Sequence, residues 1–154
     1  MRLAISTAVA VGLVLTAAGG ALAQFSAKDA VGVRENGYRE TGAAMKTIND
    51  QLKSPTPIKL MLRISAKRIV QTAHEQYGWF PAGSGPEAGG KTKAMPLIWS
   101  DSAGFKAAQD RLQQQADLMA QAVESGDSAL MRTQAHALGE ACAACHHRYR
   151  AAED

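Results

Sequence analysis

Near its C-terminal end the sequence reads ALGEACAACHHRYR, residues 137–150, and this stretch decides how the rest of the sequence is interpreted. It lies in a segment, about 127–151, whose apolar residues recur at helical spacing. On a helix, Cys142 and His146 are four residues apart and share a face, while Cys145 sits beside them. The sequence therefore predicts that two thiols and an imidazole emerge together from the last helix without unwinding it.

Three more helical segments precede this one, at about 28–52, 57–77 and 100–125. No stretch shows a sustained period of two, which argues against strands. The connections at 54–57 and 126–127 are short, whereas the one at 78–97 is long and rich in glycine and proline. Four amphipathic helices joined in this way predict an all-α fold, an antiparallel four-helix bundle. Because aromatic residues make up only 5% of the chain, a large apolar cofactor would complete its modest core.

The first predicted helix presents one continuous face, formed by Val31, Arg34, Tyr38, Thr41, Met45, Ile48 and Leu52. The same segment contains Gly32, Gly37 and Gly42, each of which costs about 1 kcal/mol relative to alanine inside a helix. This cost predicts that something bulky packs close to the backbone there; flexibility is the alternative.

The residues Cys142-Ala143-Ala144-Cys145-His146 form CxxCH, the signature of c-type haem attachment. Each thiol can add to one haem vinyl group, which tethers the macrocycle through two thioethers. His146 then lies beneath the ring and donates an imidazole nitrogen to the iron. The motif predicts one covalently attached haem c per chain.

Other chemistries are available to the same residues. A disulfide between two cysteines three positions apart would close a tiny loop and stabilise the fold little. A zinc site needs four ligands, and only Cys142, Cys145, His146 and His147 are clustered, which leaves an exported helical zinc protein as an alternative. A thioredoxin-like redox pair expects an α/β fold, which the helical pattern does not support.

Residues 1–23 have the form of a secretory signal peptide: Arg2 precedes an apolar run, and Ala21-Leu22-Ala23 is a small-x-small cleavage site. An uncleaved membrane anchor is the alternative, although the apolar run is short for a span. Cleavage would leave residues 24–154 as one haem-binding domain in the periplasm, with no membrane span. Without Arg2 the mature chain has 16 basic and 14 acidic residues and no basic run. This balance gives no electrostatic footprint for nucleic acid.

At this point the sequence resembles the cytochromes c′, within the class II c-type cytochromes. The haem motif CAACHHRYR (142–150) is similar to the family's C-terminal CxxCHxxYR. RENGY (34–38) is close to its first-helix motif. FPAGS (80–84) looks like its Phe-Gly-Pro-Gly-Thr loop, and IWSDSAGFK (98–106) resembles its IWSDxxxFK segment. The four motifs occur in the family's order and span nearly the whole mature chain.

The resemblance implies roles for individual residues. His146 would be the axial iron ligand, and Cys142 and Cys145 would form the thioethers. Arg34 would reach a haem propionate, with Glu35 at a haem-contact position. The remaining haem contacts implied are Tyr38 over the distal face, Ser84 at the haem edge and Arg150 near the proximal pocket.

Tyr38 decides the predicted chemistry. Class II members with methionine at this position resemble low-spin, six-coordinate electron carriers, whereas a residue that does not ligate implies a five-coordinate, high-spin iron. Met45 lies on the same helix face, but two turns away, about 10 Å along the axis. An inward methionine is ordinary core packing, so Met45 is expected in the core.

The predicted function is a periplasmic cytochrome that binds small gases such as NO and CO, transfers electrons to an unidentified redox partner, or both. A low-spin electron carrier with Met45 as the distal ligand is the alternative. No residue set resembles a catalytic acid-base pair or nucleophile, so an enzyme is not expected. The resemblance also implies an antiparallel homodimer built from the first two helices.

Overall fold

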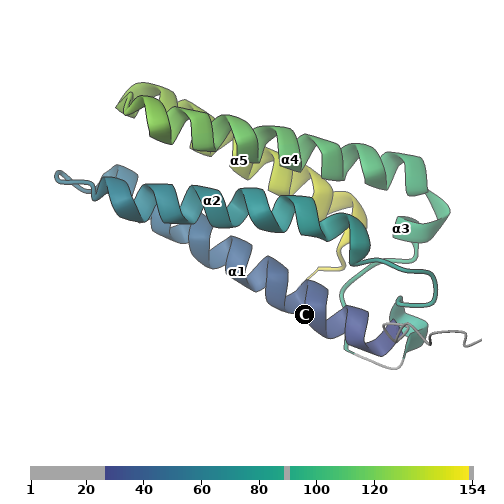
Figure 1. The fold of residues 1–154 in the computed structure, drawn as a ribbon. Helices are drawn as coiled ribbons and strands as arrows, with labels where there is room; N and C mark the ends of the chain where they lie inside the picture. The colour runs from purple at the N-terminus through teal and green to yellow at the C-terminus, as the bar shows by residue number, and fades with distance from the viewer. Residues whose placement is uncertain (1–26, 89–90, 153–154) are drawn as a thin grey trace, which may run out of the picture.

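The structure is a computed structural model that describes residues 27–88 and 91–152. Its four long helices are α1 (Ala27–Lys53), α2 (Lys59–Glu75), α4 (Ser102–Ser125) and α5 (Ser128–Tyr149). The long connection between α2 and α4 contains two 3-10 turns and one short helix: η1 (Gln76–Gly78), η2 (Pro86–Ala88) and α3 (Leu97–Ser100). This connection and the C-terminal end of α5 lie at the same end of the bundle (Figure 1).

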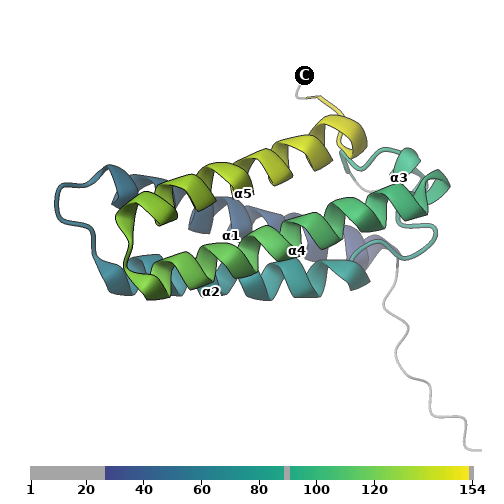
Figure 2. The same ribbon diagram turned by 90° about the horizontal axis from the view of Figure 1, so that it is seen from above.

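Consecutive long helices run in opposite directions, as the two views in Figures 1 and 2 show. Helix α1 packs along α2, α2 along α4, and α4 along α5; α1 and α5 approach each other least closely of these neighbouring pairs. The antiparallel four-helix bundle predicted from the sequence is confirmed.

Capping residues fix where the two C-terminal helices begin and where the first of them ends. The Asp101 carboxylate accepts a hydrogen bond from the Gly104 N–H at the start of α4. The Asp127 carboxylate accepts from the N–H groups of Ala129 and Leu130 at the start of α5. Between them, Gly126 ends α4 with φ of 75°, a left-handed conformation that glycine adopts without strain. A turn this short places α4 and α5 side by side.

The core is divided into an aliphatic part and an aromatic part. The aliphatic part joins all four long helices and consists of Ala44, Ile48, Leu62, Ala66, Ile69, Ala73, Leu112, Ala116, Met119, Ala122, Val123, Met131, Ala135 and Leu138. The aromatic part lies around α3 and consists of Ile98, Phe105 and Tyr149, with Phe80 and Trp99 among the side chains packed against it. The candidate site borders the aromatic part.

Some predicted helix boundaries were wrong. The second helix does not run from residue 57 to 77: α2 spans Lys59–Glu75, and the chain tightens into η1 after it. The third does not run unbroken from residue 100, because Asp101 leaves the helical conformation to cap α4. The last helix stops at Tyr149, where Arg150 becomes extended and forms a β-bridge with Ala94.

The three glycines of α1 differ in their surroundings. A Cβ at Gly37 would clash with the indole ring of Trp79, so a bulky group does pack on the backbone there. A Cβ at Gly32 or Gly42 would meet nothing within 4 Å, so no described part of the chain packs closely on the backbone at either position. A close approach of α1 to another part of the chain thus requires glycine only at position 37.

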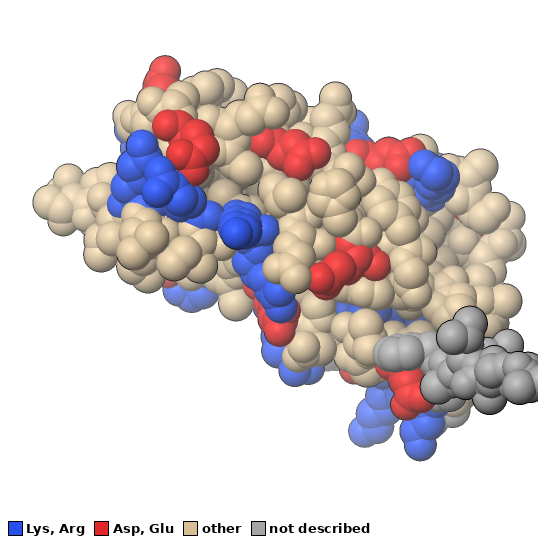
Figure 3. All heavy atoms as spheres, in the orientation of Figure 1, with Lys and Arg blue, Asp and Glu red and all other residues tan. Residues whose placement is uncertain are grey.

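The face seen in Figure 3 carries basic and acidic side chains side by side. Among the described residues, no helix is both long and apolar enough to cross a membrane. The predicted signal peptide, residues 1–23, lies outside the described part of the chain.

Candidate functional site

The two cysteines lie in the C-terminal half of α5. Both side chains are partly buried, and both thiols are free. Burial raises the pKa of Cys142, and burial together with the neighbouring Cys142 raises the pKa of Cys145 to about 11. Both sulfurs therefore carry their protons at neutral pH, and no disulfide joins them.

His146 follows on an exposed part of α5. Partial burial lowers the pKa of its imidazole, and the positive charge of Arg150 lowers it further. A neutral imidazole has a lone pair to offer to a metal. His147 is exposed, as expected for a residue about 100° further around the helix.

Arg34 is only 3% exposed, and its guanidinium donates to neutral oxygens. Its Nη1 donates to Ser84 Oγ at 3.0 Å, and its Nη2 donates to the Ser84 carbonyl and to Thr92 Oγ1, both at 2.7 Å. Burial is the main cause that lowers its pKa, and the carboxylates of Glu35 and Glu87 act in the opposite direction. The site therefore contains a buried cation whose hydrogen-bond partners are uncharged.

Ser84 is fully buried in the loop at residues 80–84, whose sequence resembles a haem-contacting loop of the cytochromes c′. Its hydroxyl donates to the Pro81 carbonyl while it accepts from Arg34. The ring of Phe80, at the start of the same loop, lies 5.0 Å from the Arg34 guanidinium carbon. The structure thus brings Arg34 and Ser84 together, whereas Glu35 is exposed on α1.

Tyr38 stands one turn after Arg34 on α1 and is partly buried. Its hydroxyl donates to Gln76 Oε1 at 3.1 Å, and its ring forms a T-shaped pair with the Trp79 ring, with centroids 5.0 Å apart. Burial is the largest cause that raises its pKa; Cys145 and Cys142 act in the same direction and Arg34 opposes them. Tyr38 is therefore a neutral phenol next to both cysteines.

Two buried glutamines, Gln76 beside Tyr38 and its partner Gln109, were not identified from the sequence. Gln76 Nε2 donates to the Gln109 carbonyl at 3.3 Å, and Gln109 Nε2 donates to the Gln76 carbonyl at 3.1 Å. The pair joins the end of α2 to α4 from positions 33 residues apart. Nothing in the local spacing of either residue distinguishes it from a surface glutamine. Thr92 was missed for a similar reason, since the loop around it has no periodic pattern.

The end of α5 is held in place by the long connection. The Asp101 carboxylate accepts from the Tyr149 hydroxyl and from Arg148 Nη2, both at 2.8 Å. The Tyr149 carbonyl accepts from the Met95 N–H at 3.0 Å. Arg150 is exposed in the β-bridge that follows. These contacts fix the last turn of the helix that carries the cysteines and His146.

Met45 and Cys142 both pack on the aliphatic core. Met45 lines a groove of about 540 Å³ between α1 and α5, together with Asn49, Leu52, Lys53, Arg132, Ala135, His136, Gly139, Glu140 and Ala143. The expectation that Met45 contributes to the core is confirmed, although its side chain is only partly buried.

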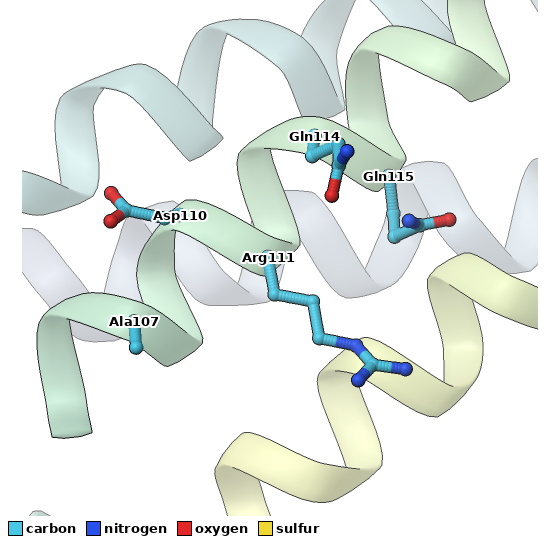
Figure 4. A pocket seen from close by; sticks show the side chains of 5 residues that line it. All are labelled: Ala107, Asp110, Arg111, Gln114 and Gln115. Carbon is cyan, nitrogen blue, oxygen red and sulfur yellow. The ribbon is translucent and has the colours of Figure 1, made fainter.

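A second, more open depression lies on α4 and is lined by Ala107, Asp110, Arg111, Gln114 and Gln115. Figure 4 shows Arg111 extending from α4 toward α5, while Asp110 points away from it. None of these residues belongs to the predicted site. In the described part of the chain, no three His, Cys, Asp or Glu side chains are grouped so that they could hold a metal ion.

The residues where α1 and α5 face each other fit a haem. Two free thiols and a neutral imidazole lie on α5, a neutral phenol lies near them on α1, and a buried cation stands one turn before it. A macrocycle with two reactive vinyl groups, an iron and two propionates has a use for each of these groups.

Comparison with known proteins is consistent with this chemistry. The family model for cytochrome C' matches residues 29–150. Cytochrome c' from Rhodospirillum rubrum is 33% identical over 118 residues, which cover 77% of this chain and 79% of that protein. Cytochrome c' from Rhodopseudomonas palustris is 31% identical over 152 residues, which cover 98% of each chain.

Solved structures show the same fold. Cytochrome c' from Thermochromatium tepidum superposes with a TM-score of 0.77 at 23% identity, covering 82% of this chain and 98% of that one. Cytochrome c' from Rubrivivax gelatinosus gives a TM-score of 0.74 at 25% identity, covering 80% and 96%. The chain belongs to the cytochrome c′ family, whose members are c-type cytochromes with covalently attached haem c.

Proposed function

We propose that Cys142 and Cys145 form the two thioethers to a single haem c and that His146 is its axial ligand. The free thiols, the neutral imidazole and the placement of all three on one helix support this assignment. A helix held at its end by Asp101 and Met95 keeps these groups in a fixed relation to one another.

Arg34 is proposed to pair with a haem propionate. A buried guanidinium with only neutral hydrogen-bond partners is costly, and an anion would offset that cost. Ser84 and Thr92 hold the guanidinium in place and leave its charge for the propionate. The exposed Glu35 is proposed to contact the haem at the edge of the site, and the exposed Arg150 is proposed to lie near the proximal pocket.

The iron is proposed to be five-coordinate, with its sixth position beneath Tyr38. When bound, the haem supplies an iron that can take up a small neutral gas such as NO or CO at that position. The observation that supports this proposal is Tyr38: a neutral phenol, hydrogen-bonded to Gln76, stands at the α1 position where class II members with a ligating thioether carry methionine. The nitric oxide complex of a variant of cytochrome c prime from Alcaligenes xylosoxidans, which shares the fold, is compatible with this use of the site.

The absorption and EPR spectra of the ferric protein test this proposal, followed by CO addition to the ferrous form. A high-spin ferric spectrum and CO binding are expected. A low-spin spectrum without CO binding would contradict the proposal and transfer the assignment to a six-coordinate electron carrier. Met45 favours that second candidate, because it packs on the same aliphatic core as Cys142 and lines the groove between α1 and α5. A Met45→Leu variant would then become high-spin.

The protein is proposed to act in the periplasm, after removal of residues 1–23, as a binding or electron-transfer protein and not as an enzyme.

The protein is proposed to form a homodimer through its first two helices. Apolar side chains on the outer face of α2, Leu60, Met61 and Ile64, are 61%, 41% and 60% exposed. Exposed apolar clusters of this kind mark association surfaces. One structural neighbour, another cytochrome c', is described as having a ligand-controlled dimer dissociation.

A further inference from the structure

Gln76 lies at the junction of α2 and η1, and its side chain is only 1% exposed. Its Nε2 donates to the carbonyl oxygens of Ala73 at 3.0 Å and Gln109 at 3.3 Å. Its Oε1 lies 3.1 Å from the Tyr38 hydroxyl. The amino group and the oxygen of the carboxamide are therefore both engaged.

The orientation of this carboxamide follows from its partners. Backbone carbonyl oxygens only accept hydrogen bonds, so the side facing Ala73 and Gln109 must be the NH2 group. The oxygen then faces Tyr38, and because that oxygen has no proton, the tyrosine hydroxyl must be the donor. The single hydroxyl proton of Tyr38 is thus committed to Gln76.

Other contacts keep Gln76 and Tyr38 in this arrangement. Gln109 Nε2 donates back to the Gln76 carbonyl at 3.1 Å, so two reciprocal bonds hold η1 against α4. The Tyr38 ring is held edge-on by Trp79, which is itself 6% exposed. Turning the hydroxyl away from Gln76 would leave the buried Oε1 without a partner, which is unfavourable.

We infer that Gln76 is a positioning residue that withholds the Tyr38 proton from a ligand bound at the iron. This inference rests on the proposed function, in which Tyr38 covers the sixth position. Hydrogen-bond donors in a distal pocket help to decide whether dioxygen is held there. By accepting the only proton that Tyr38 can give, Gln76 makes the phenol a steric cover without a donor, which favours CO and NO over dioxygen.

The first test is the C–O stretching frequency of the CO-bound ferrous protein, because a donor to bound CO lowers that frequency. The Tyr38→Phe variant removes the hydroxyl and keeps the ring. It is expected to give the same frequency as the wild type, since the wild-type hydroxyl does not donate to the ligand. A higher frequency in Tyr38→Phe would show that it does donate, and would overturn the inference.

The second test removes the acceptor. Gln76→Met frees the hydroxyl proton, so the C–O frequency should fall and the ratio of dioxygen to CO affinity should rise about tenfold, the effect of one hydrogen bond. Gln109→Met is the matched control, because it weakens the same α2–α4 contact but leaves Gln76 Oε1 in place. It is expected to change neither quantity, and the double variant Gln76→Met with Tyr38→Phe should return both to wild-type values.

Three further outcomes would overturn the inference. Gln76→Met could shift the frequency no more than Gln109→Met, or the shift could persist without the Tyr38 hydroxyl. In the third outcome, wild-type protein that binds no CO would overturn the proposed function and the inference with it. An independent readout needs no ligand: ultraviolet resonance Raman difference spectra against Tyr38→Phe should show Tyr38 as a donor in the wild type and not in Gln76→Met.

Discussion

The indole ring of Trp79 packs directly on the backbone of α1 at Gly37, where a Cβ atom would overlap the ring. Trp79 belongs to the long connection after α2, so this contact brings that connection against the helix that carries Arg34 and Tyr38. The indole ring also stands perpendicular to the Tyr38 ring, with an angle of 87° between their planes. Gly37 thus permits an approach that determines how the distal side of the site is packed.

A Gly37→Ala substitution should destabilise the protein by about 1–3 kcal/mol, the usual cost of overpacking a core. This loss should occur although alanine is favoured over glycine in a helix by about 1 kcal/mol. Gly42→Ala, where a Cβ meets nothing within 4 Å, should instead stabilise the protein by about 0.5–1 kcal/mol. Urea unfolding of the haem-loaded proteins measures both, and equal effects of the two substitutions would contradict the packing argument.

Replacing Arg34 by alanine should lower the free energy of unfolding by about 1.5–3 kcal/mol, because it removes hydrogen bonds from a charged group to Ser84 and Thr92. Arg34→Lys should recover only part of the loss, since an ammonium cannot reproduce the geometry of the guanidinium fork. The exposed Arg39 on the same helix is the control, and Arg39→Ala should change stability by less than about 0.5 kcal/mol. A full recovery by lysine would show that charge alone matters.

Truncating Tyr38 to alanine should open the proposed distal side and raise the CO association rate by about tenfold, equivalent to about 1.4 kcal/mol of barrier. Flash photolysis of the CO-bound ferrous protein measures this rate. Val33→Ala, an exposed position on the same helix, should leave it unchanged. An unchanged rate in Tyr38→Ala would remove Tyr38 from its proposed role as the cover of the iron.

Asp101 gives the stability an acid-sensitive component. The Tyr149 hydroxyl is the main cause that holds the pKa of Asp101 below its usual 3.8, with further contributions from the Gly104 N–H and Arg148. Because the folded-state pKa is the lower one, the stabilisation is present above pH 3.8 and is lost as the pH falls through the folded-state pKa.

Asp101→Asn should therefore be less stable than the wild type at pH 7, and the difference should shrink below pH 3.8. Urea unfolding from pH 2 to pH 7 checks this behaviour. Tyr149→Phe removes the main cause alone and raises the folded-state pKa toward 3.8, so its acid-induced loss should be smaller and should be complete at a higher pH than in the wild type. A penalty in Asp101→Asn that is the same at every pH would mean that its charge is not involved.

The proposed homodimer depends on the apolar outer face of α2. Ile64→Asp should produce a monomer in sedimentation experiments, because it places a charge at a side chain that is 60% exposed in the single chain. Leu130→Asp, at an equally apolar position on α5 that is 45% exposed, is the control and should leave the dimer intact. Dissociation by Leu130→Asp alone would place the interface on the opposite pair of helices.

The parts of the molecule that depend on local order were predictable from the sequence. Apolar periodicity gave the four helices, and Gly126 with Asp127 marked the turn between the last two, because the signals of these features lie within a few neighbouring residues. The CxxCH spacing identified Cys142, Cys145 and His146 for the same reason.

Contacts between distant segments were beyond the reach of these patterns. The bond from Arg34 to Thr92 joins residues 58 positions apart, and one end lies in a loop without a repeat. The Gln76–Gln109 pair depends on the position of α2 relative to α4 along the helix axes, and side-chain packing determines that position. The bonds from Arg148 and Tyr149 to Asp101 were missed because they join residues 47 and 48 positions apart.

The crowding of aromatic rings around the site has an optical consequence. The chain has two tryptophans: Trp79 lies edge-on to Tyr38, and Trp99 meets Phe80 with ring centroids 6.3 Å apart. Both indoles are therefore concentrated at one end of the bundle, around the proposed cover of the iron. The intrinsic fluorescence of this protein is a local signal that reports on movement and quenching at that end and carries no information about the turn at Gly126.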